Sequence, residues 1–86
     1  MPNNKIYLNN LDSTVTESLL KAHFARYGEI SEIHLPVDKK RGTPKGYAFI
    51  TFSEEAAAQQ ARQENGKPFL DKPLTVEIAI EKRRKQ

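Results

Sequence analysis

The chain of 86 residues has no cysteine, no tryptophan and no long apolar run. Without cysteine, disulfide bonds and thiolate metal sites are excluded, which fits a reducing cytoplasmic or nuclear setting. No apolar stretch approaches the length of a membrane-spanning helix. The first ten residues also lack the basic and then apolar order of a secretion signal. The two histidines, His23 and His34, match no metal-ligand spacing, and we expect no cofactor.

Positive charge is concentrated in two short segments of the chain, whose formal net charge is +3. Four of the 14 basic residues lie in KRRK, residues 82–85, which leaves 10 basic residues against 11 acidic ones. The second segment, DKKRGTPK at 38–45, has four basic residues and one acidic residue. A nearly neutral body with two basic segments is expected to attract polyanions. For the terminal run alone, solvated surface charge is the simpler interpretation.

Apolar residues at alternate positions predict strands in three regions. Residues 5–11, KIYLNNL, alternate so that Tyr7 faces away from the core. Residues 30–37 contain Pro36, which cannot donate a hydrogen bond to a neighbouring strand, so this strand is expected at a sheet edge. Residues 74–80, LTVEIAI, form the last predicted strand.

Two helices are expected between these strands. The first has an apolar stripe with spacings of four and three residues: Leu20, Phe24 and Tyr27. Thr16 or Thr14 can cap it, and Thr14 with Glu17 fits a capping box. Gly28 is expected to end this helix in a left-handed conformation.

The second predicted helix begins after Ser53, which we expect to be its cap. Glu54 and Glu55 in the first turn favour the helix dipole. Asn65 and Gly66 are expected to end the helix. Its inward stripe is thin and consists of two small residues, Ala57 and Ala61.

The segment KGYAFITF, residues 45–52, alternates as a half-buried strand does. One of its faces is apolar and suits the core: Ala48, Ile50 and Phe52. The other face carries Tyr47 and Phe49, which join Tyr7 on the open side. Leaving such rings exposed forgoes about 1.5–3 kcal/mol of burial free energy each. Clustered exposed rings mark a binding surface, and rings beside Lys45 suit unpaired nucleobases and phosphates.

The predicted order is strand, helix, strand, strand, helix, strand. This order predicts an α+β fold, the ferredoxin-like split βαβ sandwich, with a four-stranded antiparallel sheet and two helices on one face. One domain is expected over residues 1–80, followed by a basic tail at 81–86.

Two motifs carry a resemblance to a known family. KGYAFITF matches every defined position of the octamer K/R-G-F/Y-G/A-F-V-x-F/Y except Ile50, which replaces valine. IYLNNL, residues 6–11, is similar to the hexamer of the same family. In this order, on strands expected at the sheet centre, the motifs resemble the RNA-recognition motif, and the resemblance spans residues 5–79.

The resemblance implies a role for each matched residue. Tyr7 stacks one base, and Tyr47 and Phe49 stack a second base and pack against the sugars. Lys45 contacts a phosphate, and Gly46 keeps the backbone close to the nucleic acid.

Other candidate residues come from their place on the same face or in the basic segments. Four polar residues could read base edges or be plain solvated side chains: Asn9, His34, Thr75 and Glu77. Five basic residues are expected to contact phosphates without sequence preference: Lys39, Lys40, Arg41, Arg83 and Arg84.

Three positions depart from the family pattern. Gln60 and Glu64 occupy positions that are usually apolar, which predicts loose packing of the second helix. Asp71 replaces a common glycine, and it is expected to adopt the left-handed conformation that the turn requires.

The sequence leaves three rival interpretations to weigh. A protein-binding member of the same fold would use its helical face, and a protein partner there stays an open alternative. A hydrolase similar to acylphosphatases needs an arginine after the first strand, but residues 9–15 contain none. Dimerisation that buries the rings is the third. The sequence favours a non-enzymatic monomer that binds two to four nucleotides of single-stranded RNA, with single-stranded DNA as an alternative.

Overall fold

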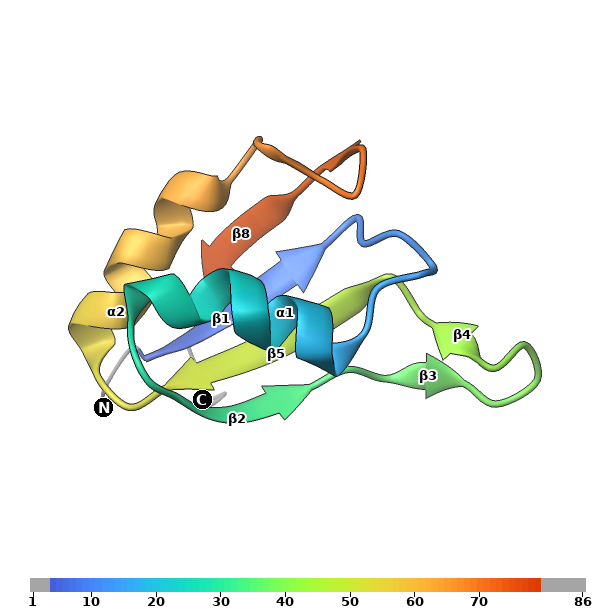
Figure 1. Ribbon diagram of the computed structural model, residues 1–86, viewed down its shortest axis with the longest axis horizontal. Helices are drawn as coiled ribbons and strands as arrows, with labels where there is room; N and C mark the ends of the chain where they lie inside the picture. Colours follow the sequence, from blue (N-terminus) through green and yellow to red (C-terminus); the bar gives the residue numbers. More distant parts are fainter. Residues whose placement is uncertain (1–3, 80–86) are drawn as a thin grey trace, which may run out of the picture.

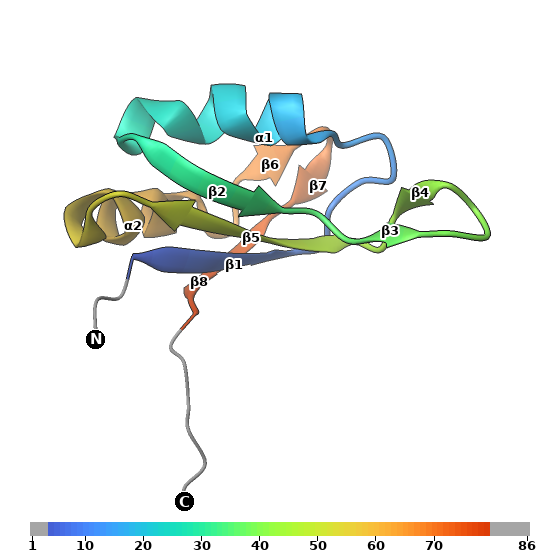
Figure 2. The ribbon, with the colours of Figure 1, turned by 90° about the horizontal axis from the view of Figure 1, so that it is seen from below.

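A four-stranded antiparallel sheet with strand order β2-β5-β1-β8 forms one layer of the molecule. The computed structural model describes residues 4–79. Its main elements follow the predicted order: β1 (Lys5–Asn9), α1 (Glu17–Phe24), β2 (Ile30–His34), β5 (Tyr47–Phe52), α2 (Glu55–Ala61) and β8 (Thr75–Ile78). Figures 1 and 2 show both helices on one side of the sheet. The predicted ferredoxin-like α+β fold is confirmed.

Short elements complete the described part of the chain. Each helix continues into a 3₁₀ turn, η1 (Ala25–Tyr27) after α1 and η2 (Arg62–Glu64) after α2. Two small hairpins lie outside the main sheet: β3 (Val37–Asp38) with β4 (Thr43–Pro44), and β6 (Pro68–Phe69) with β7 (Lys72–Pro73).

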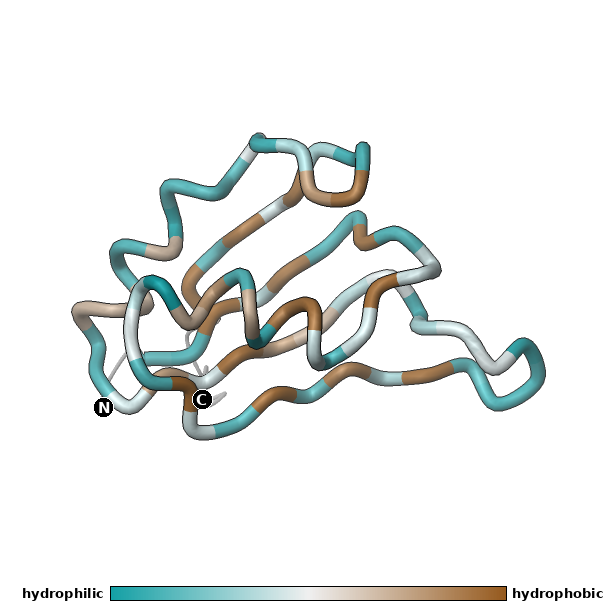
Figure 3. Tube along the Cα trace, in the orientation of Figure 1, coloured by the Kyte–Doolittle hydropathy of each residue, from teal (hydrophilic) through white to brown (hydrophobic). Residues whose placement is uncertain are grey.

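The core lies between the sheet and the helices because every second residue of the central strands faces that way. Ile6 and Leu8 of β1 pair with Ile50 and Ala48 of β5, and all four are fully buried. Leu20 and Phe24 of α1 close the core from above. Figure 3 shows these apolar stretches in the strands, in contrast to the hydrophilic loop between β3 and β4.

Both helix starts differ in detail from the prediction. Thr16 is the cap of α1, since its hydroxyl accepts from the Leu19 N–H at 3.1 Å. The capping box on Thr14 is wrong, because Thr14 instead donates to the Asp12 carboxylate from its hydroxyl at 2.7 Å and its N–H at 2.9 Å. These bonds to Thr14 lower the pKa of Asp12 below its ordinary value.

The cap predicted for the second helix is also wrong. The residue at the cap of α2 is Glu54, and its side chain makes no capping hydrogen bond. Ser53 instead uses its N–H to bond the carbonyl of Glu29 at 2.8 Å, which ties the end of β5 to the start of β2. Glu55 lies in the first turn as expected, and the helical region ends at Asn65.

Gly28 follows the first helical segment as predicted, but it is not left-handed. Its φ of 158° and ψ of 178° lie away from the left-handed helical conformation, in a positive-φ region that side chains other than glycine rarely adopt. A Cβ at this position would lie 2.5 Å from the Cβ of Ala57. Glycine is needed here because α2 packs against the backbone, and the small inward residues of α2 allow the same close approach: Ala57, Ala58 and Ala61.

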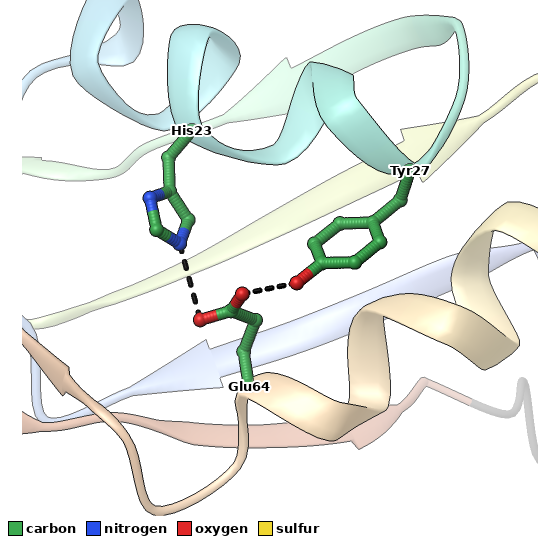
Figure 4. A network of polar contacts seen from close by, with 3 residues as sticks. All are labelled: His23, Tyr27 and Glu64. Atoms are coloured by element: carbon green, nitrogen blue, oxygen red, sulfur yellow. Dashed lines mark hydrogen bonds and ion pairs between the residues drawn. The ribbon is translucent and has the colours of Figure 1, made fainter.

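The two residues that led to the prediction of loose packing, Gln60 and Glu64, have different surroundings. Gln60 points to solvent, and Glu64 is 6% exposed. Figure 4 shows that the Tyr27 hydroxyl donates to one Glu64 oxygen, while His23 Nε2 lies 3.1 Å from the other without hydrogen-bond alignment. Burial raises the pKa of Glu64, but the contacts with Tyr27 and His23 outweigh burial and lower it.

The predicted strand at 30–37 is divided in two. β2 ends at His34, and Val37 belongs to the β3–β4 hairpin, where it is exposed. β2 is an edge strand, as Pro36 indicated. In the β6–β7 turn, Asp71 has a φ of 70°, so its predicted left-handed conformation is confirmed.

Candidate nucleic-acid interface

Three rings lie side by side on the sheet face that the helices leave uncovered. Tyr7 pairs with Phe49 across β1 and β5, and Tyr47 lies two residues before Phe49 on the same side. The ring centroid of Tyr7 is 5.3 Å from that of Phe49 and 6.2 Å from that of Tyr47. The centroids of Tyr47 and Phe49 are 6.2 Å apart. We call these three rings the aromatic platform.

The pleat of β5 explains why the platform stays open. Buried and half-buried residues alternate without interruption from Tyr47 to Phe52. The buried residues fill the core beneath the helices, so the residues between them must face the other way. All three platform rings are half-buried, and none is part of the core. The prediction that they form one surface is confirmed.

Polar residues extend the platform across the sheet. His34, Phe49, Tyr7 and Glu77 form one row across the four strands, and the His34 ring is 6.3 Å from that of Phe49. Asn9 lies between Tyr47 and Thr75 in the next row. Asn9, His34 and Glu77 are exposed and Thr75 is half-buried. The structure therefore brings together the four residues predicted to read base edges.

Sequence reasoning missed Lys5, which begins β1. Its Nζ lies 5.8 Å from the centroid of the Phe49 ring, within range of a cation–π interaction. The signal was available, since Lys5 is two residues before Tyr7 and must share its face. Glu32 of β2 and Thr51 of β5 lie beside Lys5, because both Lys5 and Glu32 pair with Thr51. Neither Glu32 nor Thr51 was predicted to be a site residue.

Lys45 and Gly46 lie where the basic loop enters β5. Lys45 is exposed, and its N–H bonds the carbonyl of Pro36 at 3.0 Å. Gly46 has a φ of 101°, in the region that favours glycine, and its carbonyl accepts from the Leu11 N–H at 3.0 Å. These bonds fix the direction in which the strand leaves the loop.

The predicted phosphate contacts are only partly placed by the structure. Asp38 orders the loop by accepting from the Lys40 N–H at 2.9 Å. Figure 2 shows the β3–β4 hairpin projecting past one end of the sheet, so its basic tip lies away from the platform centre. The exposed residues of this tip are Lys39, Lys40 and Arg41. Arg83 and Arg84, with the rest of the predicted tail, lie outside the described residues.

Residues 4–79 contain neither a cluster of metal ligands nor a helix suited to span a membrane. No group of three or more His, Cys, Asp or Glu side chains could hold a metal ion there. No helix in this part of the chain has the length and apolar character that crossing a membrane requires.

The sequence profile of one family, described as the RNA recognition motif, matches residues 6–75. The chain belongs to this family. This RNA recognition motif also resembles solved structures that were determined with RNA. One is described as an Sxl-lethal protein/RNA complex, with a TM-score of 0.83 and 32% identity over 90% of this chain and 48% of that chain. Another is the Rna15 motif with bound RNA (GU), with a TM-score of 0.85 and 25% identity, covering 93% of this chain and 86% of that one.

Curated relatives of this RNA recognition motif differ in length. Polyadenylate-binding protein 2 of Schizosaccharomyces pombe is 38% identical over 83% of this chain and 43% of its own length. Multiple RNA-binding domain-containing protein 1 of Neurospora crassa is 38% identical over 92% of this chain, which spans only 9% of that relative. RbpD of Nostoc sp. (strain PCC 7120) is 39% identical over 86% of this chain and 80% of its own length.

Proposed function

We propose that this chain binds a short segment of single-stranded RNA across the open face of its sheet. The observation that carries the proposal is the aromatic platform, in which Tyr7, Tyr47 and Phe49 lie within 5.3–6.2 Å of one another on the uncovered face. Bases stack on such rings with about 1–3 kcal/mol each, whatever their sequence. The membership in the RNA recognition motif family supports the same function.

The rings are well suited to this task because the sheet already holds them in place. Tyr7 and Phe49 are paired across adjacent central strands, so little conformational freedom is left for binding to remove. The Tyr7 and Tyr47 hydroxyls make no hydrogen bond within residues 4–79, and they would donate to sugar or phosphate oxygens. Tyr7 would stack one base, and Tyr47 and Phe49 a second base and the intervening sugars.

Positive charge would supply affinity without sequence preference. Lys45 is exposed where β5 begins, next to Tyr47, and would contact a phosphate. Lys39, Lys40 and Arg41 at the hairpin tip would attract a strand that continues past the end of the sheet, as would Arg83 and Arg84. Asn9, Thr75 and Glu77 would contact base edges.

The size of the platform limits the bound segment to two to four nucleotides, with single-stranded DNA as an alternative ligand. The proposed role is binding without catalysis, by a monomer inside the cell, in the cytoplasm or the nucleus. A protein partner on the helical face is compatible with this role, because the helices do not contribute to the platform.

The experiment that tests the proposal replaces Phe49 with alanine. Fluorescence anisotropy with labelled single-stranded octamers should show binding weakened by about 1–3 kcal/mol, because a stacking surface is lost. The matched control is Leu19→Ala, which removes an exposed apolar side chain from α1 on the opposite side of the molecule. Unchanged affinity of a folded Phe49→Ala variant would rule out stacking on the platform.

A further inference from the structure

A hollow lies beside the aromatic platform, at the β2 edge of the sheet. It is lined by Lys5, Glu32, His34, Phe49 and Thr51. The strand register explains this grouping. Glu32 on β2 and Lys5 on β1 both lie opposite Thr51 of the strand between them, and His34 lies opposite Phe49. The hollow therefore has Phe49 and Thr51 as its floor, with an acidic residue at one wall and a basic residue at the other.

The polar side chains of the hollow make no hydrogen bond or ion pair to one another or to the rest of residues 4–79. Within residues 4–79, Lys5 and Glu32 form no ion pair, although they carry opposite charges on the same face. The side chains of His34 and Thr51 make no hydrogen bond in the same part of the chain. Lys5 is instead held over the Phe49 ring at 5.8 Å. Within residues 4–79, the Glu32 carboxylate and the His34 imidazole thus have no hydrogen-bond or ion-pair partner, and the Lys5 ammonium group contacts the Phe49 ring that forms the floor.

We propose that this hollow binds a guanine base of the RNA, and that Glu32 and Lys5 select it. The inference rests on the proposed function and names the preferred base of the same surface. A carboxylate accepts two parallel hydrogen bonds, and the Watson–Crick edge of guanine offers two adjacent donors, N1–H and the N2 amino group. The other long edge of guanine presents N7 and O6, which are both acceptors and suit the Lys5 ammonium group.

The other bases fit this pair of charges less well. Uracil offers one donor, N3–H, between two carbonyl oxygens that repel a carboxylate. Cytosine and adenine each offer one amino group beside a ring nitrogen that accepts, so the carboxylate gains one hydrogen bond and faces one lone pair. Adenine also presents its amino group on the edge that would face Lys5. Glu32 therefore discriminates most strongly between guanine and uracil.

The test measures the binding of four labelled RNA octamers by fluorescence anisotropy. One is all uridine, and the others carry a single guanosine, adenosine or cytidine at the fourth position. We expect the guanosine octamer to bind about tenfold more tightly than the all-uridine octamer, since a bidentate contact discriminates strongly. Glu32→Gln should reduce this ratio to about twofold or less, because glutamine replaces one acceptor with a donor.

The matched control is Glu29→Gln, which makes the same change of charge at an exposed residue before β2. It should keep the preference for guanosine, which separates base reading from the general effect of removing a negative charge. Chemical shifts of the Glu32, His34 and Thr51 amides should also change more with the guanosine octamer than with the all-uridine octamer.

Two outcomes would overturn the inference while the proposed function stands. In the first, all four octamers bind equally and Phe49→Ala weakens them all. In the second, the preference for guanosine survives in Glu32→Gln. If the wild-type protein binds none of the octamers, the proposed function and the inference both fail.

Discussion

The two sides of the sheet each carry a cluster of aromatic rings, and the clusters differ in what completes them. On the helical side, the His23 ring packs between those of Phe24 and Phe69, with centroids 5.0 and 4.9 Å away, and the Tyr27 hydroxyl bonds Glu64. The platform rings on the open side contact one another, with Lys5 and His34 beside Phe49, but the Tyr7 and Tyr47 hydroxyls have no hydrogen-bond partner within residues 4–79. Aromatic side chains therefore stabilise the fold on the helical side of the sheet, and on the open side they remain available to a ligand.

The largest expected effect on stability comes from replacing a buried ring of β5, which can be compared with an open-side ring of the same strand. Phe52 and Phe49 belong to β5 but face opposite sides, and Phe52 is fully buried. Phe52→Ala should lower the free energy of unfolding by about 3–5 kcal/mol, because it opens a cavity in the core. Urea denaturation followed by circular dichroism measures this change.

The same measurement on Phe49→Ala is the control, and it should show a much smaller loss of stability. The contrast would be contradicted if Phe49→Ala destabilised the protein as much as Phe52→Ala. Phe49 would then be a core residue rather than part of a ligand surface.

A smaller loss of stability is expected when the polar contacts between the two helical segments are removed. Glu64→Ala leaves the Tyr27 hydroxyl and His23 Nε2 without their acidic partner, and should lower the free energy of unfolding by about 1–3 kcal/mol. Affinity for RNA in the folded variant should be unchanged, because Glu64 of η2 contacts Tyr27 and His23 on the helical side of the sheet, away from the platform.

The lowered pKa of Glu64 gives this prediction a pH dependence. The folded pKa lies below the ordinary value of 4.5, so the stabilisation is complete above that pH and is lost as the pH falls through the folded pKa. Glu64→Gln keeps the shape without the titration. Its stability should therefore fall less between neutral and acidic pH than that of the wild type, and parallel curves would show that Glu64 is not coupled to folding.

The smallest expected effect is on the salt dependence of RNA binding, when the positive charge of Lys45 before β5 is removed. Lys45→Ala should reduce the slope of log affinity against log salt by about 0.7, the value for one phosphate contact on a single strand. Titrations at several salt concentrations measure the slope, with Lys21→Ala on α1 as a control of equal charge change. An unchanged slope would give Lys45 a purely structural role in the loop.

The element order and the two sheet faces could be predicted from the sequence because strand periodicity is a local property. Residues 5–9 and 47–52 alternate strictly, and this alternation assigned Tyr7, Tyr47 and Phe49 to one face before any contact was known. The match to the octamer and hexamer then indicated the function of that face. Lys5 could have been included by the same periodicity.

Local rules failed where two distant segments meet. Gly28 followed the first helical segment as expected, but its backbone is not left-handed, and its lack of a Cβ is required by the close approach of Ala57 of α2. Ser53 resembled a cap, but its N–H bonds Glu29 at the neighbouring strand, and Glu54 takes the cap position. Each alternative was locally reasonable, and packing between elements decided among them.

The sequence by itself determined which residues alternate, where helices form, and which rings face away from the core, because these follow from backbone geometry along a single segment. Only the tertiary structure decided that Glu64 is buried against His23 and Tyr27, and that Glu32 and Lys5 come to opposite sides of one hollow. The physical reason is that these groups lie on separate elements, and strand register and helix packing set the distances between them.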